Sequence, residues 1–424
     1  MPIMDVAVRA ESVQRIAVPE RDLTVLRRLA EQVAALAQQP EQAEKRSLWL
    51  RHNKLEATRP IIFCDPENGW DEIITESSCV SPLAQDYERY LRKQIFWGTR
   101  MGDDRVIEPY INVPHVYTQS DFGLPVEMVG GEGKGAYTWT PPLTDYEKLS
   151  ELHDASITVD WEKSAELKAL VEKIFDGILT VRQHTNWWWS LGMTREVILL
   201  RGMQEYFEDL IEEPESVHRL MEILMHSNMH KLDFLERNGL LASNTNDTYV
   251  GSGGFGYTDE LPVTGADGKV HPANMWGFLE SQETLSISPS MFAEFIYPYQ
   301  KPLLERFGLN CYGCCEPIDK RWHVIKDTKN LRRVSVSAWA DKEKMAENLN
   351  QRFIYSYKPR ATPLAMHDMD EKSVRSELTE VLEKAQGCRV EFIMKDNNTL
   401  GNNPDNVVKW CRITRELVDR LWKA

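Results

Sequence analysis

The sequence predicts an α/β fold, a (β/α)8 TIM barrel preceded by an N-terminal helical extension. The chain has 424 residues, a length that one α/β barrel with insertions commonly reaches. Short β-branched or aromatic runs alternate with longer amphipathic stretches, which is the pattern of a parallel sheet with helical crossovers. Nine such runs occur, close to the eight strands that close a barrel.

The start of the chain reads as helical. Leu26, Leu29, Val33 and Leu36 recur at helical spacing with charged residues between them. No strand pattern precedes residue 59. We therefore expect two units, an N-terminal helical extension over residues 1–58 and a barrel over residues 59–424.

The expected strands and helices follow in alternation from residue 60. The nine candidate strands are short and apolar or β-branched, at residues 60–65, 106–116, 178–184, 240–245, 275–280, 309–313, 334–338, 353–357 and 390–395. The expected helices are amphipathic, at residues 164–175, 215–236, 290–306, 341–350 and 371–386. Two irregular stretches interrupt this order, a Gly- and Pro-rich excursion or lid over 123–142 and a loop over 251–272.

Composition excludes several classes of protein. The formal net charge of -15 argues against nucleic acid as a partner, because binding to phosphates needs a basic surface. No run of apolar residues is long enough to span a membrane, and residues 1–22 lack a secretory signal. The seven cysteines are odd in number and partly crowded together, unlike a disulfide scaffold. We expect a soluble cytoplasmic enzyme, for which an oligomer is possible.

Polar residues follow several of the expected strands, at the rim where TIM barrels carry their active sites. Glu280 ends one strand, His184 ends another, and Asn246 follows the strand at 240–245. We take these three as candidate catalytic residues. The candidate substrate-binding residues share the same rim and include an aromatic wall for a flat substrate: Trp187, Asp247 and Tyr249.

The sharpest feature of the sequence is a cysteine-rich strand end. Cys314, Cys315 and Glu316 follow the strand at 309–313, and thiolates and carboxylates are both good zinc ligands. Alternate residues of a strand point to one side, so either Cys314 with Glu316 or Cys311 with Cys315 could face the barrel mouth. The alternative is that these cysteines are small buried apolar residues. Metal binding is the preferred interpretation.

The second half of the chain resembles a known family. The run Ser288–Phe292 with the letters SPSMF, then Tyr297-Pro298-Tyr299, then a strand ending in Cys-Glu-Pro, resembles the uroporphyrinogen decarboxylase superfamily. The resemblance covers residues 276–424 well and the first half loosely. The Arg-rich N-terminal segment with which the decarboxylases grip porphyrin carboxylates is missing, so no decarboxylation of uroporphyrinogen is expected.

The corrinoid-dependent methyltransferase branch is the more similar one. There a zinc ion sits on a His-x-Cys pair at the end of the sixth strand and on a Cys in the last strand's loop. Cys314 and Glu316 fall at the pair, and Asp396 falls at the distal Cys. The resemblance thus implies one zinc ion held by Cys314, Glu316 and Asp396 with Cys315 in reserve.

The function that the resemblance implies is methyl transfer. A methyl group would pass from a small methylated substrate, an aryl methyl ether in the first place, to the cobalt of a corrinoid carrier protein, with zinc as Lewis acid on the ether oxygen. Two alternatives stay open, a decarboxylase or lyase of the same superfamily and a non-catalytic barrel that binds a corrinoid or another ligand. Measuring the metal content distinguishes the zinc-dependent methyltransferase from these two alternatives, neither of which needs a metal.

Overall fold

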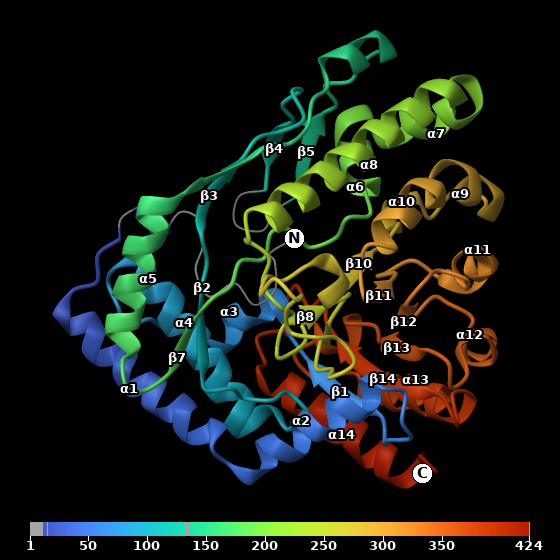
Figure 1. Ribbon diagram of the computed structural model, residues 1–424. Helices are drawn as coiled ribbons and strands as arrows, with labels where there is room; N and C mark the ends of the chain where they lie inside the picture. Colours follow the sequence, from blue (N-terminus) through green and yellow to red (C-terminus); the bar gives the residue numbers. More distant parts are fainter. Residues whose placement is uncertain (1–11, 15, 132–135, 424) are drawn as a thin grey trace.

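The computed structural model describes residues 12–14, 16–131 and 136–423, and its centre is a parallel sheet (Figure 1). Six strands lie in the order β1-β14-β13-β12-β11-β10. Nearly all of their residues are buried, as expected for parallel strands with both faces covered. In chain order the strands are β1 (Ile61–Cys64), β10 (Trp276–Leu279), β11 (Leu309–Tyr312), β12 (Leu331–Ser337), β13 (Ile354–Lys358) and β14 (Arg389–Met394).

Two further strands form a separate parallel pair, β2 (Tyr110–Val113) with β7 (Thr180–Gln183). Together with the sheet they give eight strands in parallel ladders within the described ranges. In the part of the chain that the structure describes, no ladder joins the pair to an edge of the sheet. The fold is therefore TIM-barrel-like, but the described strands do not close into the barrel that the sequence predicts.

Eight of the nine predicted strands are confirmed with small shifts of their ends, and the one at 240–245 is wrong. In its place the side chain of Asn244 bonds the edge of β10. Its Nδ2 donates to the Trp276 carbonyl at 2.9 Å, and its Oδ1 accepts from the Trp276 N–H at 2.9 Å. A side-chain amide thus substitutes for a strand backbone, which an apolar pattern in the sequence cannot distinguish from a real strand.

The helical reading of the N-terminal region is confirmed by α1 (Glu20–Ala37) and α2 (Pro40–Asn53). The apolar stripe of α1 is buried and packs on α4 (Pro82–Phe96). Trp49 of α2 donates its Nε1 to the carbonyl of Asp104 at 2.8 Å. The N-terminal helices therefore share the core of the sheet.

The predicted helices along the rest of the chain are also present, with one difference. The stretch 290–306 is two helices that meet at Ile296, since Pro298 begins a new first turn more easily than it continues an old one. The remaining helices are α3 (Trp70–Ile73), α5 (Trp161–Phe175), α6 (Thr194–Arg201), α7 (Met203–Glu212), α8 (Pro214–Arg237), α9 (Pro289–Phe295), α10 (Tyr297–Leu304), α11 (Trp322–Ile325), α12 (Lys342–Leu349), α13 (Glu371–Lys384) and α14 (Asp405–Leu421). In the described ranges, no helix has both the length and the apolar character that crossing a bilayer requires.

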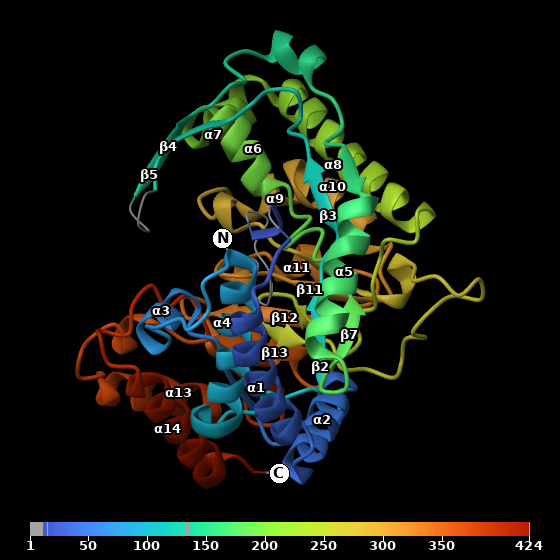
Figure 2. The same cartoon turned by 90° about the vertical axis from the view of Figure 1, so that its left-hand side faces the viewer.

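The excursion predicted at 123–142 is an antiparallel hairpin of β4 (Glu127–Gly130) and β5 (Tyr137–Thr140). Its strand residues are almost all exposed, and Figure 2 shows it projecting from the body of the molecule. The strands that flank this excursion in the chain, β3 (Val116–Gln119) and β6 (Ile157–Asp160), pair antiparallel with each other. Residues 132–135 lie outside the described part. A short antiparallel pair, β8 (Tyr249–Val250) with β9 (Gly254–Phe255), begins just before the second irregular stretch and ends within it.

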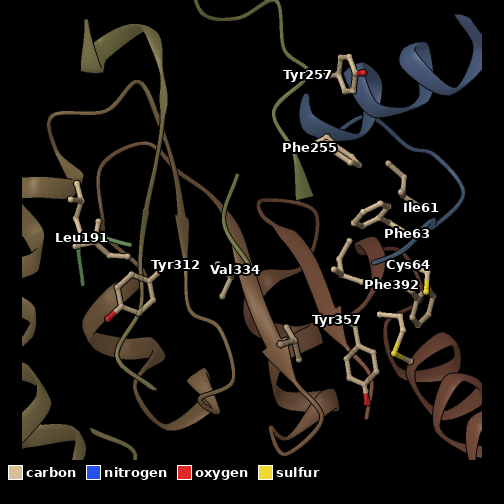
Figure 3. Close-up of a cluster of buried hydrophobic side chains, with 14 of the residues drawn as sticks. Ile61, Phe63, Cys64, Leu191, Phe255, Tyr257, Tyr312, Val334, Tyr357 and Phe392 are labelled. Atoms are coloured by element: carbon tan, nitrogen blue, oxygen red, sulfur yellow. The ribbon is translucent and has the colours of Figure 1, made fainter. Parts of the chain in front are cut away.

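The interior combines aromatic packing with charge. Phe63 of β1 contacts Phe255, with ring centroids 4.8 Å apart, and Figure 3 shows these rings among other buried side chains. Beside them lies a group of fully buried polar residues that we call the buried ion-pair layer: His52, Asn53, Arg333, Ser356 and Glu391. Arg333 Nε lies 2.9 Å from Glu391 Oε1, and His52 Nε2 lies 3.2 Å from Glu391 Oε2. Arg333 also donates to Asn53 Oδ1 at 2.7 Å.

Candidate active site

Residues from three strand ends meet at the carboxyl edge of the sheet, and we call them the rim cluster: Glu67, Cys314, Cys315, Lys395 and Asp396. Glu67 follows β1, the two cysteines follow β11, and the last two follow β14. β11 and β14 are not neighbours in the sheet. Their loops nevertheless touch, so the sheet curls enough to bring distant strand ends together, as an active site at a barrel mouth requires.

Two sulfur atoms and an ammonium group form the inner part of the rim cluster. Cys314 Sγ lies 3.6 Å from Cys315 Sγ, and Lys395 Nζ lies 3.5 Å from Cys314 Sγ and 3.0 Å from Asp396 Oδ1. Cys315 donates to Asp396 Oδ2 at 3.7 Å. Burial opposes the charge of Lys395, but Cys314 and Asp396 outweigh it and raise the pKa of the ammonium group. Three of the predicted metal ligands, Cys314, Cys315 and Asp396, are thus brought together.

The outer part of the rim cluster contains an acid that titrates near neutrality. Burial raises the pKa of Glu67 to about 7, Asp396 and Asp65 add to the shift, and Lys395 opposes it. Glu67 and Asp396 have φ values of 49° and 61°, in the left-handed region that residues other than glycine seldom adopt. Backbone strain of this kind costs free energy and concentrates at functional sites.

Glu316 contacts the backbone of Cys314 rather than its sulfur atom, and its role as a metal ligand stays a prediction. Its side chain is fully buried. Its Oε2 accepts from the Cys314 N–H at 2.8 Å and its Oε1 accepts from the Ser281 N–H at 2.8 Å. Both oxygens are therefore engaged with backbone N–H groups at two strand ends, since Ser281 follows β10 and Cys314 follows β11. Glu316 fixes the loop that carries the cysteines.

Zinc binding needs three or four side chains directed at one point. Across residues 12–14, 16–131 and 136–423, no three His, Cys, Asp or Glu side chains are arranged so that they could hold a metal ion. The ammonium group of Lys395 lies against Cys314 and Asp396, where a cation would compete with it. The residues in this arrangement do not fit zinc, and zinc binding stays a prediction.

Glu280, a candidate catalytic residue, is 2% exposed and lies at the end of β10. Burial, with Glu283 and Glu316 nearby, raises its pKa well above the usual carboxyl range. Its Oε2 accepts from the Gln282 N–H at 2.9 Å. Glu280 is therefore a buried carboxyl group whose charged form is disfavoured, at the same edge as the rim cluster.

His184 and Asp247 form a group of their own at the end of β7. Arg182 Nη2 lies 3.0 Å from Asp247 Oδ1, and His184 Nε2 lies 3.2 Å from Asn186 Oδ1. Burial and the charge of Arg182 lower the pKa of His184, which keeps its ring neutral at pH 7. The roles assigned to these two residues stay predictions.

The remaining candidates divide between core and rim. Trp187 is 5% exposed, donates Nε1 to the Leu240 carbonyl at 3.0 Å and stacks on His115, so it packs in the interior. Asn246 Oδ1 accepts from the hydroxyl of Thr248 at 2.8 Å and shapes its own loop. Tyr249 donates its hydroxyl to Asp65 Oδ2 at 3.0 Å, two residues from Glu67, and so lies beside the rim cluster.

The sequence interpretation assigned no role to Glu67, Lys358 or Lys395. Asp65-Pro66-Glu67 directly follows a predicted strand, so its position could have indicated Glu67. Lys358 ends β13 and is 6% exposed, and burial lowers its pKa to about 8. Its Nζ donates to the hydroxyl of Ser356. A buried lysine cannot be recognised from a strand pattern alone.

One cavity, of about 1370 Å³, lies at the opposite edge of the sheet. Arg59 and Arg415 line it and both bind Asp104, at 2.8 and 2.7 Å. Asp104 Oδ2 also accepts from the N–H of Ile62 in β1 at 2.8 Å. These contacts hold the amino end of the sheet together, which is the usual role of that face in barrels.

Comparison with known proteins identifies no family for this chain. No family model matches it, and no curated relative matches it. Among solved structures, a methyltransferase from Methanosarcina mazei is similar with 10% identity and a TM-score of 0.47, over 88% of this chain and 98% of that one. At this identity and TM-score the similarity assigns neither a family nor an activity.

Proposed function

We propose that this protein transfers a methyl group from a small methylated substrate, an aryl methyl ether in the first place, to the cobalt of a corrinoid carried by a partner protein. The sequence resemblance described above motivates the reaction. One observation supports placing the reaction at the rim cluster. The carboxyl group of Glu67, beside Lys395 and Asp396, has a pKa of about 7.

The chemical demand on the protein is to improve a poor leaving group. The reduced corrinoid supplies the nucleophile that takes the methyl group. When the bond from carbon to oxygen breaks, the oxygen keeps the electron pair and needs a proton. Glu67 is partly exposed, half protonated near pH 7 and so matched to that task, since general acids work best when their pKa lies near the working pH.

Other residues of the rim would position this acid. Lys395 favours the charged form of Glu67 and keeps its pKa from rising further. Tyr249 binds Asp65 and fixes the loop that carries Glu67. Asp396 faces both Lys395 and Cys315. No step is assigned to zinc, because the arrangement of the described side chains does not fit it.

A second candidate, a lyase acting on a carbonyl substrate, is favoured by Lys358. A buried amine with a pKa of about 8 is partly neutral at pH 7 and can attack a carbonyl carbon. The resulting imine is trapped by borohydride, and trapping of a keto acid on Lys358 would support this candidate over methyl transfer.

The test is a methyl-transfer assay with the purified full chain. Reduced free cobalamin serves as acceptor, and methoxylated aromatics, methanol and methylamines serve as donors. We expect methylated cobalamin from an aryl methyl ether and a large loss in Glu67→Gln. Zinc content is measured on the same preparation. Absence of transfer from every donor would contradict the proposal.

A further inference from the structure

The seven cysteines include two pairs of neighbouring thiols in very different surroundings. Cys314 and Cys315 are adjacent in sequence, with sulfur atoms 3.6 Å apart. Cys64 and Cys411 also interact through their side chains, but both are fully buried. Figure 3 shows Cys64 within the packed interior. Cys315 is partly exposed, so solvent reaches the first pair and not the second.

Access is unequal within the exposed pair. Cys314 is completely buried and Cys315 is not. A small oxidant in solution therefore meets Cys315 first. Cys314 lies directly behind it and beside the ammonium group of Lys395, at 3.5 Å. The contact with Cys315 and burial raise the pKa of the Cys314 thiol, and the charge of Lys395 opposes that shift and so favours the thiolate, the form that attacks a disulfide. An exposed sulfur that reacts first and a buried sulfur next to it are the arrangement needed to form a disulfide in two steps.

The backbone around the pair determines how lasting such a bond would be. Consecutive Cα atoms are about 3.8 Å apart, whereas disulfides usually span about 4.4–6.8 Å between Cα atoms. A bond between adjacent cysteines is therefore strained and is reduced easily. Gly313, with φ of 91°, precedes the pair, and Glu316 holds the N–H of Cys314. The backbone of the turn is thus held on both sides, so that the disulfide would form by movement of the two side chains.

We propose that Cys314 and Cys315 are a redox-active vicinal dithiol, which a small disulfide closes reversibly into a bond between the two residues. The Cys315 thiolate attacks the small disulfide, forms a mixed disulfide and releases one thiol. The Cys314 thiolate then attacks the Cys315 sulfur and releases the second thiol. The pair is oxidised by two electrons, the small disulfide is reduced by two, and both cysteine protons end on the released thiols.

Closure would change the rim cluster without unfolding it. Asp396 would lose the S–H donor of Cys315, and Lys395 would lose its contact with the Cys314 thiol. Lys395 would then face Asp396 and Glu67 alone. Oxidation would also remove both thiols from any metal chemistry at this site. The inference does not depend on which reaction the rim performs.

The experiment treats the folded full chain with oxidised glutathione, followed by intact-mass measurement and peptide mapping. We expect the wild type to lose the mass of two hydrogen atoms, to map the bond to residues 314 and 315, and to regain the mass with dithiothreitol. Cys314→Ser should stop at a glutathione adduct on Cys315. Cys315→Ser should not react, and Cys411→Ala, in the buried pair, should behave as the wild type.

Three results would overturn the proposal: no change of mass in the wild type, a lasting glutathione adduct on wild-type Cys315, or a bond from Cys315 to another cysteine or another chain. Near-ultraviolet circular dichroism checks that each variant folds. If Cys314→Ser does not fold, the wild-type map and Cys315→Ser still decide, because each gives a distinct mass.

Discussion

The rim cluster lies at the carboxyl edge of the sheet, whereas the buried ion-pair layer lies inside the protein. Both are groups of ionisable side chains, and they differ in how fully the charges are paired. In the layer, Glu391 is bound by Arg333 and His52, and although burial opposes it, the charge of Arg333 keeps the pKa of Glu391 far below its usual range. In the rim, Glu67 has a pKa raised to about 7.

The difference separates stability from reactivity. A buried carboxylate with a cation and hydrogen bonds stays charged at every physiological pH and holds strands together. A carboxyl group that is half protonated near neutrality can exchange a proton with a ligand. We therefore assign the layer to the fold and the rim to chemistry.

The largest expected effect is on the layer. Arg333→Met leaves the Glu391 carboxylate buried without its main partner, and breaking a buried pair in this way costs about 3–5 kcal/mol. Urea unfolding measures it. The control is Arg412→Met, because Arg412 makes an ion pair with the exposed Glu416 worth about 1 kcal/mol at most. Equal stability of the two variants would contradict the assignment.

The next effect concerns Glu316, a carboxyl group next to the rim cluster to which we assign a structural role. Glu316→Gln keeps one acceptor for the N–H groups of Cys314 and Ser281 but loses the charge. We expect a loss of about 1–3 kcal/mol in the free energy of unfolding and an unchanged pH dependence of the reaction. A shifted pH profile would show that Glu316 takes part in the chemistry.

Lys395→Met should alter the reaction more than the fold. Removing the ammonium group removes the charge that lowers the pKa of Glu67. We expect the descending limb of the pH–rate profile to move upward by about one pH unit, the scale of a nearby opposite charge. Lys409→Met, at a surface ion pair with Glu371, is the control. An unchanged pH–rate profile would show that the charge of Lys395 does not set the pKa of the group that limits the rate.

The smallest effect concerns stability against pH. Because the folded-state pKa of Glu67 lies above that of the unfolded chain, its contribution falls as pH rises from the ordinary carboxyl range to about 7. Glu67→Gln should therefore gain stability relative to the wild type as pH rises from about 5 to 8, by less than about 1 kcal/mol after solvent screening. Glu391 has the opposite sign, since its contribution is lost as pH falls. Thermal unfolding at several pH values measures both.

Much of the architecture could be predicted from the sequence because buried parallel strands are short continuous apolar runs. The rim positions of Cys314, Cys315 and Asp396 followed from strand ends alone, and the structure brings them together. The strand at 240–245 was wrong because the Asn244 side chain, and not its backbone, bonds β10.

The roles of individual rim residues could not be read in the same way. Glu316 is held by an N–H from Ser281, which belongs to a neighbouring strand end and is invisible in local sequence. The pKa values of Glu67 and Lys358 depend on burial by distant segments. Trp187 is a core residue because Leu240 offers it a carbonyl. Alternation along one strand determines a side chain's face but not its partners.

The most direct test of the central claim is the pH dependence of methyl transfer from an aryl methyl ether to reduced cobalamin, in the wild type and in Glu67→Gln. We predict a wild-type rate that falls as pH rises through about 7, and a variant slower by about 100-fold or more with that limb abolished, as expected for loss of a general acid. A variant with the wild-type rate and the same descending limb would contradict it.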